Sequence, residues 1–178
     1  MSHELADGMS PYAGLPEVRI GAHLDHEQSR SQYEGEEFFL GKVDTPANVG
    51  TYLDAPFHRF ADREDLSQVP LERLAGIQAV VIDAGDAPSR ALDPELPDSE
   101  LGGRAVLIRT GWDSRWGTDA YWEPGPYLTE EFAASLVENE IGLVGVDFWN
   151  VMTQQREPPH PHAFAGSRDP HRGTPFVI

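Results

Sequence analysis

The chain has 178 residues, a length that fits one folded domain better than two. Its 30 acidic and 13 basic residues give a net charge of −17, which repels nucleic-acid phosphates and anionic lipid, so neither is expected as a partner. The absence of cysteine excludes disulfides, thiolate zinc sites and cysteine nucleophiles and leaves His, Asp and Glu for metal or acid–base chemistry. No apolar run approaches the ~20 residues of a transmembrane helix, and we expect a cytoplasmic protein.

The first part of the chain predicts an irregular segment followed by strands. Residues 1–35 are rich in Gly, Pro, Ser and charged side chains, with only short apolar runs, and are expected to form an irregular N-terminal arm. Apolar segments at 38–43 and 48–53 predict two strands, separated by a turn at Thr45-Pro46. This strand-rich first half argues against a simple doubly wound sheet.

The rest of the chain predicts alternating helices and strands. Residues 66–74 indicate a short helix that starts near the proline in the middle of the segment. Compact apolar runs at 79–83 and 105–109 predict strands buried on both faces. Thr129, followed by two glutamates, is typical of a helix N-terminus, and 141–146 predicts another buried strand. These elements favour a mixed α/β domain.

The stretch 48–60 places a carboxylate and an imidazole four residues apart, at Asp54 and His58. In an extended strand the two would lie ~13 Å apart, but Pro56 suits the first position of a helix and predicts a turn that folds His58 back toward Asp54. The pair then forms a general acid–base unit or the start of a Zn²⁺ or Mn²⁺ site. A hydrogen-bonded turn, with Asp54 capping backbone N–H groups, is the alternative.

This stretch resembles the signature of the cyclase family that includes bacterial kynurenine formamidase and isatin hydrolase, His-x-Gly-Thr-His-x-Asp-x-Pro-x-His. The matching positions are Asn48, Gly50, Thr51, Tyr52, Asp54, Pro56 and His58. The family's opening is similar to SHELADGMSPYAGLP, and its later blocks are similar to VLIRTGWDSRW, PYLTEEFAASL and LVGVDFWN, in the same order. The resemblance therefore covers residues 2–151.

The resemblance implies a single α/β domain of the swivelling β/β/α type, a mixed sheet with flanking helices, spanning residues 1–151. It also implies a homodimer or larger homo-oligomer that hydrolyses an amide or lactam at zinc or manganese, with a role in tryptophan catabolism. By the family pattern Asp54 is a metal ligand and His58 the acid–base residue. Asn48 and Tyr52 stand where the family has histidine ligands, and an amide and a phenol are poor zinc ligands. A tight metal site is therefore not expected.

Two further features carry candidate site residues. Trp112 and Trp116, with Tyr121 and Trp122, form an aromatic cluster that would wall a pocket for a flat aromatic substrate or pack as a loop onto the core. Asp147 follows the strand at 141–146 and presents either a ligand-binding carboxylate or a cap of a turn.

Residues 152–178 form a Pro- and His-rich tail outside this domain. His160 and His162 resemble the family's late histidine ligand, which makes them candidate metal ligands, but no glutamate follows Glu157. One choice of synonymous codons for residues 168–173 reads, in the neighbouring frame, as Gly-Ile-Pro-Ile-Val-Glu, which resembles the family's closing strand and Glu ligand. An out-of-frame tail is therefore a hypothesis, and it predicts that the closing strand is missing and a sheet edge is exposed.

These observations support two functions. The first is an amidohydrolase that cleaves an N-formyl or lactam C–N bond of a small aromatic substrate, with His58 as acid–base residue and Asp54 as its orienting partner. Asn48 or Tyr52 would then donate a hydrogen bond to the developing oxyanion. The alternative is a metal-free, non-catalytic relative that binds a small aromatic acid. A damaged product that folds without function is a third interpretation.

Overall fold

The computed structural model of the chain describes residues 2–11, 14–151 and 176–177. The chain divides into two compact units, Met1–Tyr52 and Leu53–Ile178. Among the described residues, no helix has the length and apolar character needed to cross a membrane.

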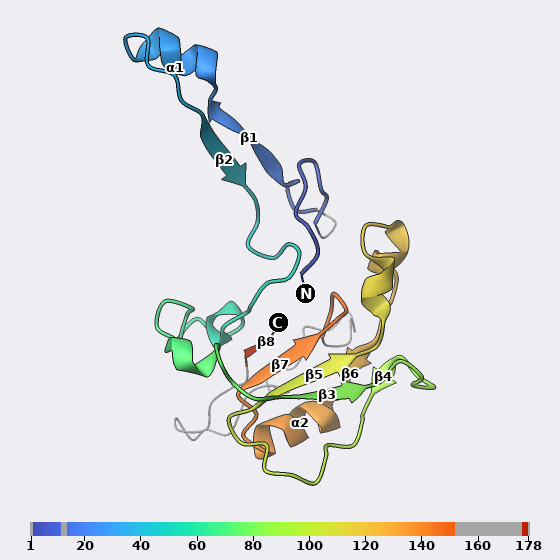
Figure 1. Cartoon of the computed structure of the whole chain (residues 1–178). Coiled ribbons are helices and arrows are strands. Elements are labelled where there is room, and N and C mark those ends of the chain that lie inside the picture. Colours follow the sequence, from blue (N-terminus) through green and yellow to red (C-terminus); the bar gives the residue numbers. More distant parts are fainter. Residues whose placement is uncertain (1, 12–13, 152–175, 178) are drawn as a thin grey trace. The chain divides into compact units, whose positions relative to one another are not determined.

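The first unit contains an antiparallel hairpin, formed by β1 (Arg19–Leu24) and β2 (Leu40–Asp44), with helix α1 (His26–Gln32) in the connection (Figure 1). Asp25 caps α1 by accepting a hydrogen bond from the Gln28 backbone N–H at 2.8 Å, while the Gln28 side chain accepts one from the Asp25 N–H at 3.0 Å. The expectation of an irregular arm was therefore wrong, because this capping box and the pairing with β2 order residues 19–32.

Strand β2 (Leu40–Asp44) overlaps the strand predicted at 38–43 and confirms it with shifted ends. The strand predicted at 48–53 does not form. Gly50 has φ +66°, in the left-handed region, and a turn there interrupts an extended chain. A Cβ on Gly50 would also lie 2.8 Å from the Cδ2 atom of Leu5, so a side chain there would require the end of Leu5 to move.

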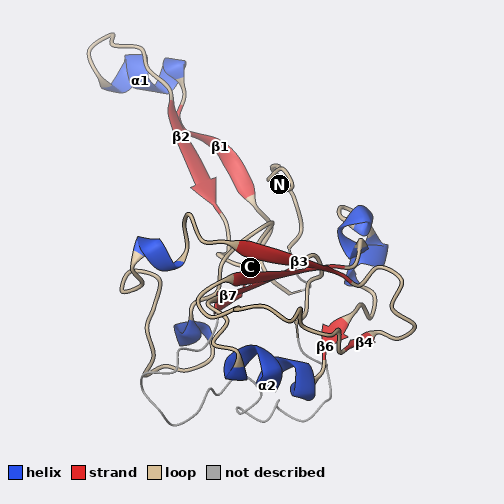
Figure 2. Cartoon of the chain, turned by 60° about the horizontal axis from the view of Figure 1, so that its bottom comes forward, coloured by secondary structure: helices blue, strands red, loops and turns tan. Residues whose placement is uncertain are grey.

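The second unit is built on a parallel sheet with the strand order β3-β5-β7-β8. These strands are β3 (Ala79–Asp83), β5 (Ala105–Arg109), β7 (Leu143–Val146) and β8 (Phe176–Val177). Helix α2 (Glu130–Glu138) lies against one face of the sheet (Figure 2). Short 3-10 helices η1 (Pro56–His58), η2 (Leu71–Arg73), η3 (Trp112–Arg115) and η4 (Asp119–Trp122) and the small parallel pair β4 (Ala91–Leu92) and β6 (Tyr127–Leu128) complete the unit.

The core of this unit lies between α2 and the central strands. Phe132 and Leu136 of α2 pack in one cluster with apolar side chains of β5 and β7, and both are almost completely buried. Burying each such side chain contributes ~1.5–3 kcal/mol to the stability of the fold. On the sheet, Gly145 of β7 is paired with Leu107 of β5, and a Cβ at Gly145 would lie 2.5 Å from the Cδ2 atom of Leu107.

The strands at 79–83 and 105–109 form as predicted, residue for residue. The expectation that both faces of each are buried holds for most of β5 but is wrong for β3, where burial alternates and Val81 is exposed. The reason is that only one face of β3, which carries Val80 and Ile82, packs against the core, whereas the opposite face is uncovered. The predicted short helix near Pro70 is confirmed as η2.

Strand β8 occupies the sheet edge beside β7. Phe176 pairs with Leu143 and Val177 with Val144, in parallel. The expectation of a missing closing strand is therefore wrong for these two residues, because the apolar end of the chain supplies the pairing. The remainder of the tail, including His160 and His162, lies outside the described residues.

Candidate active site

Asp54 and His58 lie side by side at η1, as the sequence predicted. Pro56 occupies the first turn of η1, and the His58 N–H donates to the Ala55 carbonyl at 2.9 Å, which closes the turn. The Asp54 Oδ1 atom lies 3.5 Å from the Nδ1 atom of His58. The side chains are 26% and 45% exposed, respectively, so both are accessible to a small molecule.

The orientation of this pair determines which ring nitrogen can react. When Nδ1 of His58 carries the proton that faces Asp54, Nε2 carries the lone pair and can exchange a proton with a ligand. A distance of 3.5 Å is at the outer limit of a hydrogen bond, and such contacts commonly tighten when substrate binds. The geometry therefore suits an acid–base residue with an orienting carboxylate.

Asn48 and Tyr52, the other two candidates from the signature stretch, are half-buried. They belong to the unit Met1–Tyr52, whereas Asp54 and His58 belong to the unit Leu53–Ile178. The structure therefore defines the geometry of the Asp54–His58 pair alone.

The donor set does not fit a zinc or manganese centre. No group of three or more His, Asp or Glu side chains that could hold a metal ion occurs within residues 2–11, 14–151 and 176–177. A structural or catalytic zinc needs three or four such protein ligands. Asp54 with one imidazole supplies too few, and the amide of Asn48 and the neutral phenol of Tyr52 add little.

The aromatic cluster forms a loop, residues 111–125, that packs against itself and, through Trp112, onto the hydrophobic core, as the second sequence interpretation expected. The ring of Tyr121 meets those of Trp116 and Trp122 edge to face, with centroids 5.1 Å apart in each pair. The indole N–H of Trp112 donates to the Tyr121 carbonyl at 3.0 Å, and the Arg115 guanidinium lies 3.8 Å from the Trp112 ring centroid. We call this segment the aromatic loop. Trp112 and Trp116 are half-buried residues.

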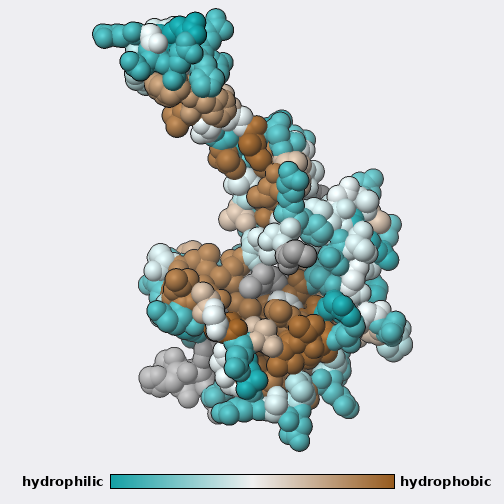
Figure 3. Space-filling model, in the orientation of Figure 1, coloured by the Kyte–Doolittle hydropathy of each residue, from teal (hydrophilic) through white to brown (hydrophobic). Residues whose placement is uncertain are grey.

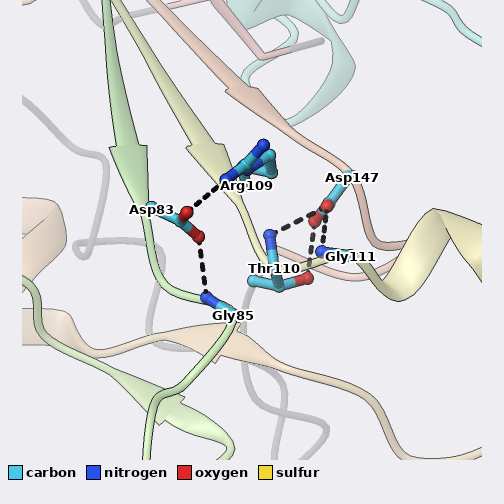
Figure 4. Close-up of polar contacts among 6 residues, drawn as sticks. All are labelled: Asp83, Gly85, Arg109, Thr110, Gly111 and Asp147. Atoms are coloured by element: carbon cyan, nitrogen blue, oxygen red, sulfur yellow. Dashed lines mark hydrogen bonds and ion pairs between the residues drawn. The ribbon is translucent and has the colours of Figure 1, made fainter.

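Sequence reasoning missed an ion pair at the carboxyl ends of the parallel strands (Figure 4). Arg109, the last residue of β5, donates a hydrogen bond to Asp83, the last residue of β3, and the Gly85 N–H donates to the same carboxylate at 3.2 Å. These two hydrogen bonds hold the pKa of Asp83 below its ordinary value of 3.8, and Asp83 in turn raises the pKa of Arg109. The ion pair forms because the two strands are paired in register, so that their last residues lie side by side. The sequence does not specify this register.

Asp147 caps the turn that follows β5, which confirms the turn-cap interpretation. Its carboxylate accepts hydrogen bonds from the Thr110 N–H at 2.8 Å, the Thr110 hydroxyl at 2.6 Å and the Gly111 N–H at 2.6 Å (Figure 4). Asp147 follows β7, so it connects the ends of two neighbouring strands.

These features define a mixed α/β protein whose polar groups gather at the ends of a parallel sheet. Residues 1–152 match the Cyclase family model, and the chain belongs to this family. A solved isatin hydrolase, bound to the product analogue thioisatinate, shares the fold with a TM-score of 0.66 at 22% identity, over 92% of this chain and 68% of that one. A predicted metal-dependent hydrolase from Bacillus stearothermophilus also shares the fold, with a TM-score of 0.69 at 20% identity, over 99% of this chain and 78% of that one.

Curated relatives include kynurenine formamidases of two Bacillus species. The Bacillus cereus enzyme is 31% identical over 125 residues, which cover 70% of this chain and 58% of the relative. The Bacillus mycoides enzyme is 30% identical over 125 residues, which again cover 70% of this chain and 58% of the relative. The chain thus spans 58% of the length of these relatives.

Proposed function

We propose that the protein hydrolyses the N-formyl or lactam C–N bond of a small aromatic substrate, in the manner of a kynurenine formamidase. The observation that carries this proposal is the Asp54–His58 pair, whose facing atoms are 3.5 Å apart within the stretch that resembles the family signature. A formyl derivative of kynurenine, an intermediate of tryptophan breakdown, is the proposed substrate, since the curated relatives are named for that activity.

His58 acts as general base and then as general acid. Asp54 holds the imidazole with Nδ1–H toward the carboxylate, so that Nε2 removes a proton from the attacking water. The water oxygen bonds to the formyl carbon, and the C–N bond then breaks as the proton passes from Nε2 to the departing amine. The products are the free amine and formic acid, which releases its remaining proton to solvent to give formate.

The developing oxyanion needs hydrogen-bond donors. The side-chain amide of Asn48 and the hydroxyl of Tyr52 are the proposed donors, since both carry polar hydrogens and occupy the signature stretch. One structural neighbour is a predicted metal-dependent hydrolase, which argues for a divalent metal, but the donor set of the described residues does not fit one. No step of this mechanism uses one.

Trp112 and Trp116 of the aromatic loop are the proposed wall for the substrate ring. Both are half-buried, and edge-to-face packing with Tyr121 holds the Trp116 ring in a defined orientation. A rigid aromatic surface favours a flat ring over an aliphatic chain.

The decisive experiment measures hydrolysis of N-formylkynurenine by the wild type and by His58→Ala. Loss of the acid–base residue is expected to lower kcat by about 10²- to 10⁴-fold. The matched control is His23→Ala, since His23 is an exposed histidine in β1, and it is expected to leave kcat unchanged. Equal rates for the wild type and His58→Ala would refute the proposed mechanism.

The shortage of metal ligands among residues 2–11, 14–151 and 176–177 favours a second candidate, a non-catalytic relative that binds a small aromatic acid. This function predicts saturable binding of anthranilate by calorimetry together with no turnover of the formamide. Detectable turnover that depends on His58 excludes it.

We propose the following organisation for the chain. Residues 1–151 form the cyclase domain with an N-terminal arm over 1–35 that contains β1 and α1, and residues 152–178 form an atypical tail whose end, β8, pairs with the sheet; the extent of the family match, 1–152, supports this boundary. We retain an out-of-frame origin of the tail as a hypothesis. Sequencing the coding DNA tests it, because codons that do not encode Gly-Ile-Pro-Ile-Val-Glu in the neighbouring frame exclude it.

We further propose a homodimer or larger homo-oligomer in the cytoplasm. The hairpin leaves large apolar side chains exposed along both strands, among them Ile20, Leu40 and Val43 (Figure 3). A two-stranded hairpin is only marginally stable by itself, so cover from a second copy would stabilise it. The absence of cysteine supports the location, because the fold requires no oxidising compartment.

A further inference from the structure

The chain forms a closed loop directly after the Asp54–His58 pair. The Phe57 N–H donates to the Glu64 carbonyl at 3.1 Å, which joins the two ends of residues 57–64. We call this segment the η1 loop. Since His58 is itself part of the η1 loop, the other side chains of the loop are the first candidates for contact with a ligand held at His58.

The η1 loop carries two arginines, Arg59 and Arg63, and both are exposed. Arg59 follows His58 directly, and consecutive Cα atoms are ~3.8 Å apart. Because an arginine side chain is longer than this spacing, the guanidinium of Arg59 can reach a ligand held at His58. The Arg63 N–H donates to the Phe60 carbonyl at 3.0 Å, a turn that folds the chain back within the same loop.

These two arginines have no protein partner in the described part of the chain, where neither guanidinium forms an ion pair or a hydrogen bond. By contrast, six basic side chains there do pair with a carboxylate: Arg19, Arg30, Lys42, Arg73, Arg109 and Arg115. The chain has 30 acidic residues, so a shortage of carboxylates does not explain two unpaired guanidinium groups.

The carboxylates in and beside the η1 loop are directed away from both arginines. Asp54 faces the Nδ1 atom of His58 at 3.5 Å. Glu64 accepts a hydrogen bond from Arg73 of η2 at 3.1 Å. Asp62 is exposed and, among the described residues, pairs with neither arginine. The donors of both guanidinium groups are therefore available to a ligand.

We propose that Arg59 and Arg63 bind a carboxylate of the substrate, so that the substrate class is a formamide that also carries a carboxylate. A guanidinium presents paired N–H donors in a geometry that matches the two oxygens of a carboxylate. The net charge of −17 repels an anion from the molecule as a whole, and two local cations beside His58 offset that repulsion where the substrate binds. The inference rests on the proposed function, because the Asp54–His58 pair defines where the formamide lies.

The experiment compares two formamides that share an aromatic ring and differ in charge. N-formylanthranilate carries a carboxylate beside the formamide, and formanilide carries none. KM and kcat are measured for the wild type, for Arg59→Gln, for Arg63→Gln and for the variant with both changes. The matched control combines Arg30→Gln with Arg109→Gln, since it also removes two positive charges, from exposed arginines that already pair with carboxylates.

The variant that lacks both arginines is expected to raise KM for N-formylanthranilate about tenfold, because hydrogen bonds to a charged group are lost. Each single change is expected to raise it less. KM for formanilide, and kcat for both formamides, should stay near the wild-type values, because neither arginine touches a reacting atom. The control variant is expected to behave as wild type. An unchanged KM for N-formylanthranilate, or an equal rise for both formamides, would overturn the inference.

Two further measurements separate ligand binding from a role in the fold. Arg59→Lys keeps the charge without the forked donors and is expected to give an intermediate KM for N-formylanthranilate. Sodium chloride screens exposed charges, so it should raise this KM in the wild type and raise it less in the variant that lacks both arginines. An equal salt effect in the two proteins would contradict the inference. If the variant with both changes does not fold by far-UV circular dichroism, the single variants decide.

Failure of the proposed function gives a different result. If the wild type hydrolyses neither formamide, the proposed hydrolysis is wrong, and binding of anthranilate by equilibrium dialysis replaces KM. A loss of anthranilate affinity in the variant that lacks Arg59 and Arg63, with the control variant unaffected, still supports the carboxylate site. An unchanged affinity overturns it. A wild type that neither hydrolyses N-formylanthranilate nor binds anthranilate also overturns the inference, because the two arginines then hold no carboxylate.

Discussion

At the scale of single residues, Pro56 places the reactive pair. Because the ring of proline restricts φ and suits the first turn of a helix, the chain turns at η1 and brings His58 to within 3.5 Å of Asp54. This part of the site was predictable, since the proline lies inside the motif. The hydrogen-bond partners of Asp83 and Asp147 were not predictable, because they are set by the register between strands and not by local spacing.

The ligand shortage around Asp54 gives a prediction about metal content. After incubation with Zn²⁺ or Mn²⁺ and removal of the excess, elemental analysis is expected to find well under one metal ion per chain, because a stable site needs three or four good ligands. Asp54→Asn is expected to give the same value as the wild type. One ion per chain, lost in this variant, would show that further residues complete a site around Asp54.

The pKa of Asp83 gives a prediction about acid stability. Since this pKa is lowered in the folded protein, the ionised carboxylate stabilises the fold above the ordinary value of 3.8, and the contribution disappears as pH falls through the lower folded-state pKa. The melting temperature of Asp83→Asn should therefore lie slightly below wild type at pH 7 and converge with it below pH 3.8. The effect is small because both partners are exposed. Asp86→Asn, an exposed neighbour, serves as control, and a constant difference at all pH values would contradict the assignment.

At the scale of secondary-structure elements, α2 shows a helix specified by local sequence. Thr129 caps it by accepting the Phe132 N–H at 3.1 Å, and its first turn is acidic. The central strands β3, β5 and β7 were equally predictable from compact apolar runs. In contrast, β1 was missed because its strand structure depends on pairing with a distant segment, β2.

The cap of α2 can be tested directly. Thr129→Ala is expected to lower the free energy of unfolding by ~1 kcal/mol, since it leaves the Phe132 N–H without its side-chain acceptor. Urea denaturation monitored by far-UV circular dichroism measures the change. Thr129→Ser keeps the hydroxyl and should retain most of the stability, whereas equal losses in both variants would point to the lost methyl group.

At the scale of the whole molecule, the chain combines a well-packed unit with a hairpin that buries almost none of its own strand residues. Pattern analysis identified the mixed α/β class, which depends on runs within single segments. Pattern analysis did not predict the exposed hairpin, since whether an apolar strand residue is covered depends on the rest of the molecule. This contrast is the basis for the proposed oligomer.

A charge placed on the hairpin tests the oligomer. The wild type is expected to sediment as a dimer or larger species, and Val43→Glu is expected to shift it to the monomer, because burying an unpaired carboxylate is costly. Val81→Glu is a matched control, since Val81 is 61% exposed on β3 and Val43 is 62% exposed on β2. A monomeric wild type at high concentration, or an identical shift in both variants, would contradict the proposal.

The close approach of Gly145 to Leu107 has a consequence for how this sequence can change over time. A Cβ at Gly145 would lie 2.5 Å from the Cδ2 atom of Leu107, so the end of the leucine side chain has to move to admit it. The two positions therefore share one volume across neighbouring strands, and a larger residue at one costs less when a smaller residue stands at the other. Substitutions at the two positions are thereby coupled: Gly145→Ala is better tolerated once Leu107 has been replaced by a smaller residue.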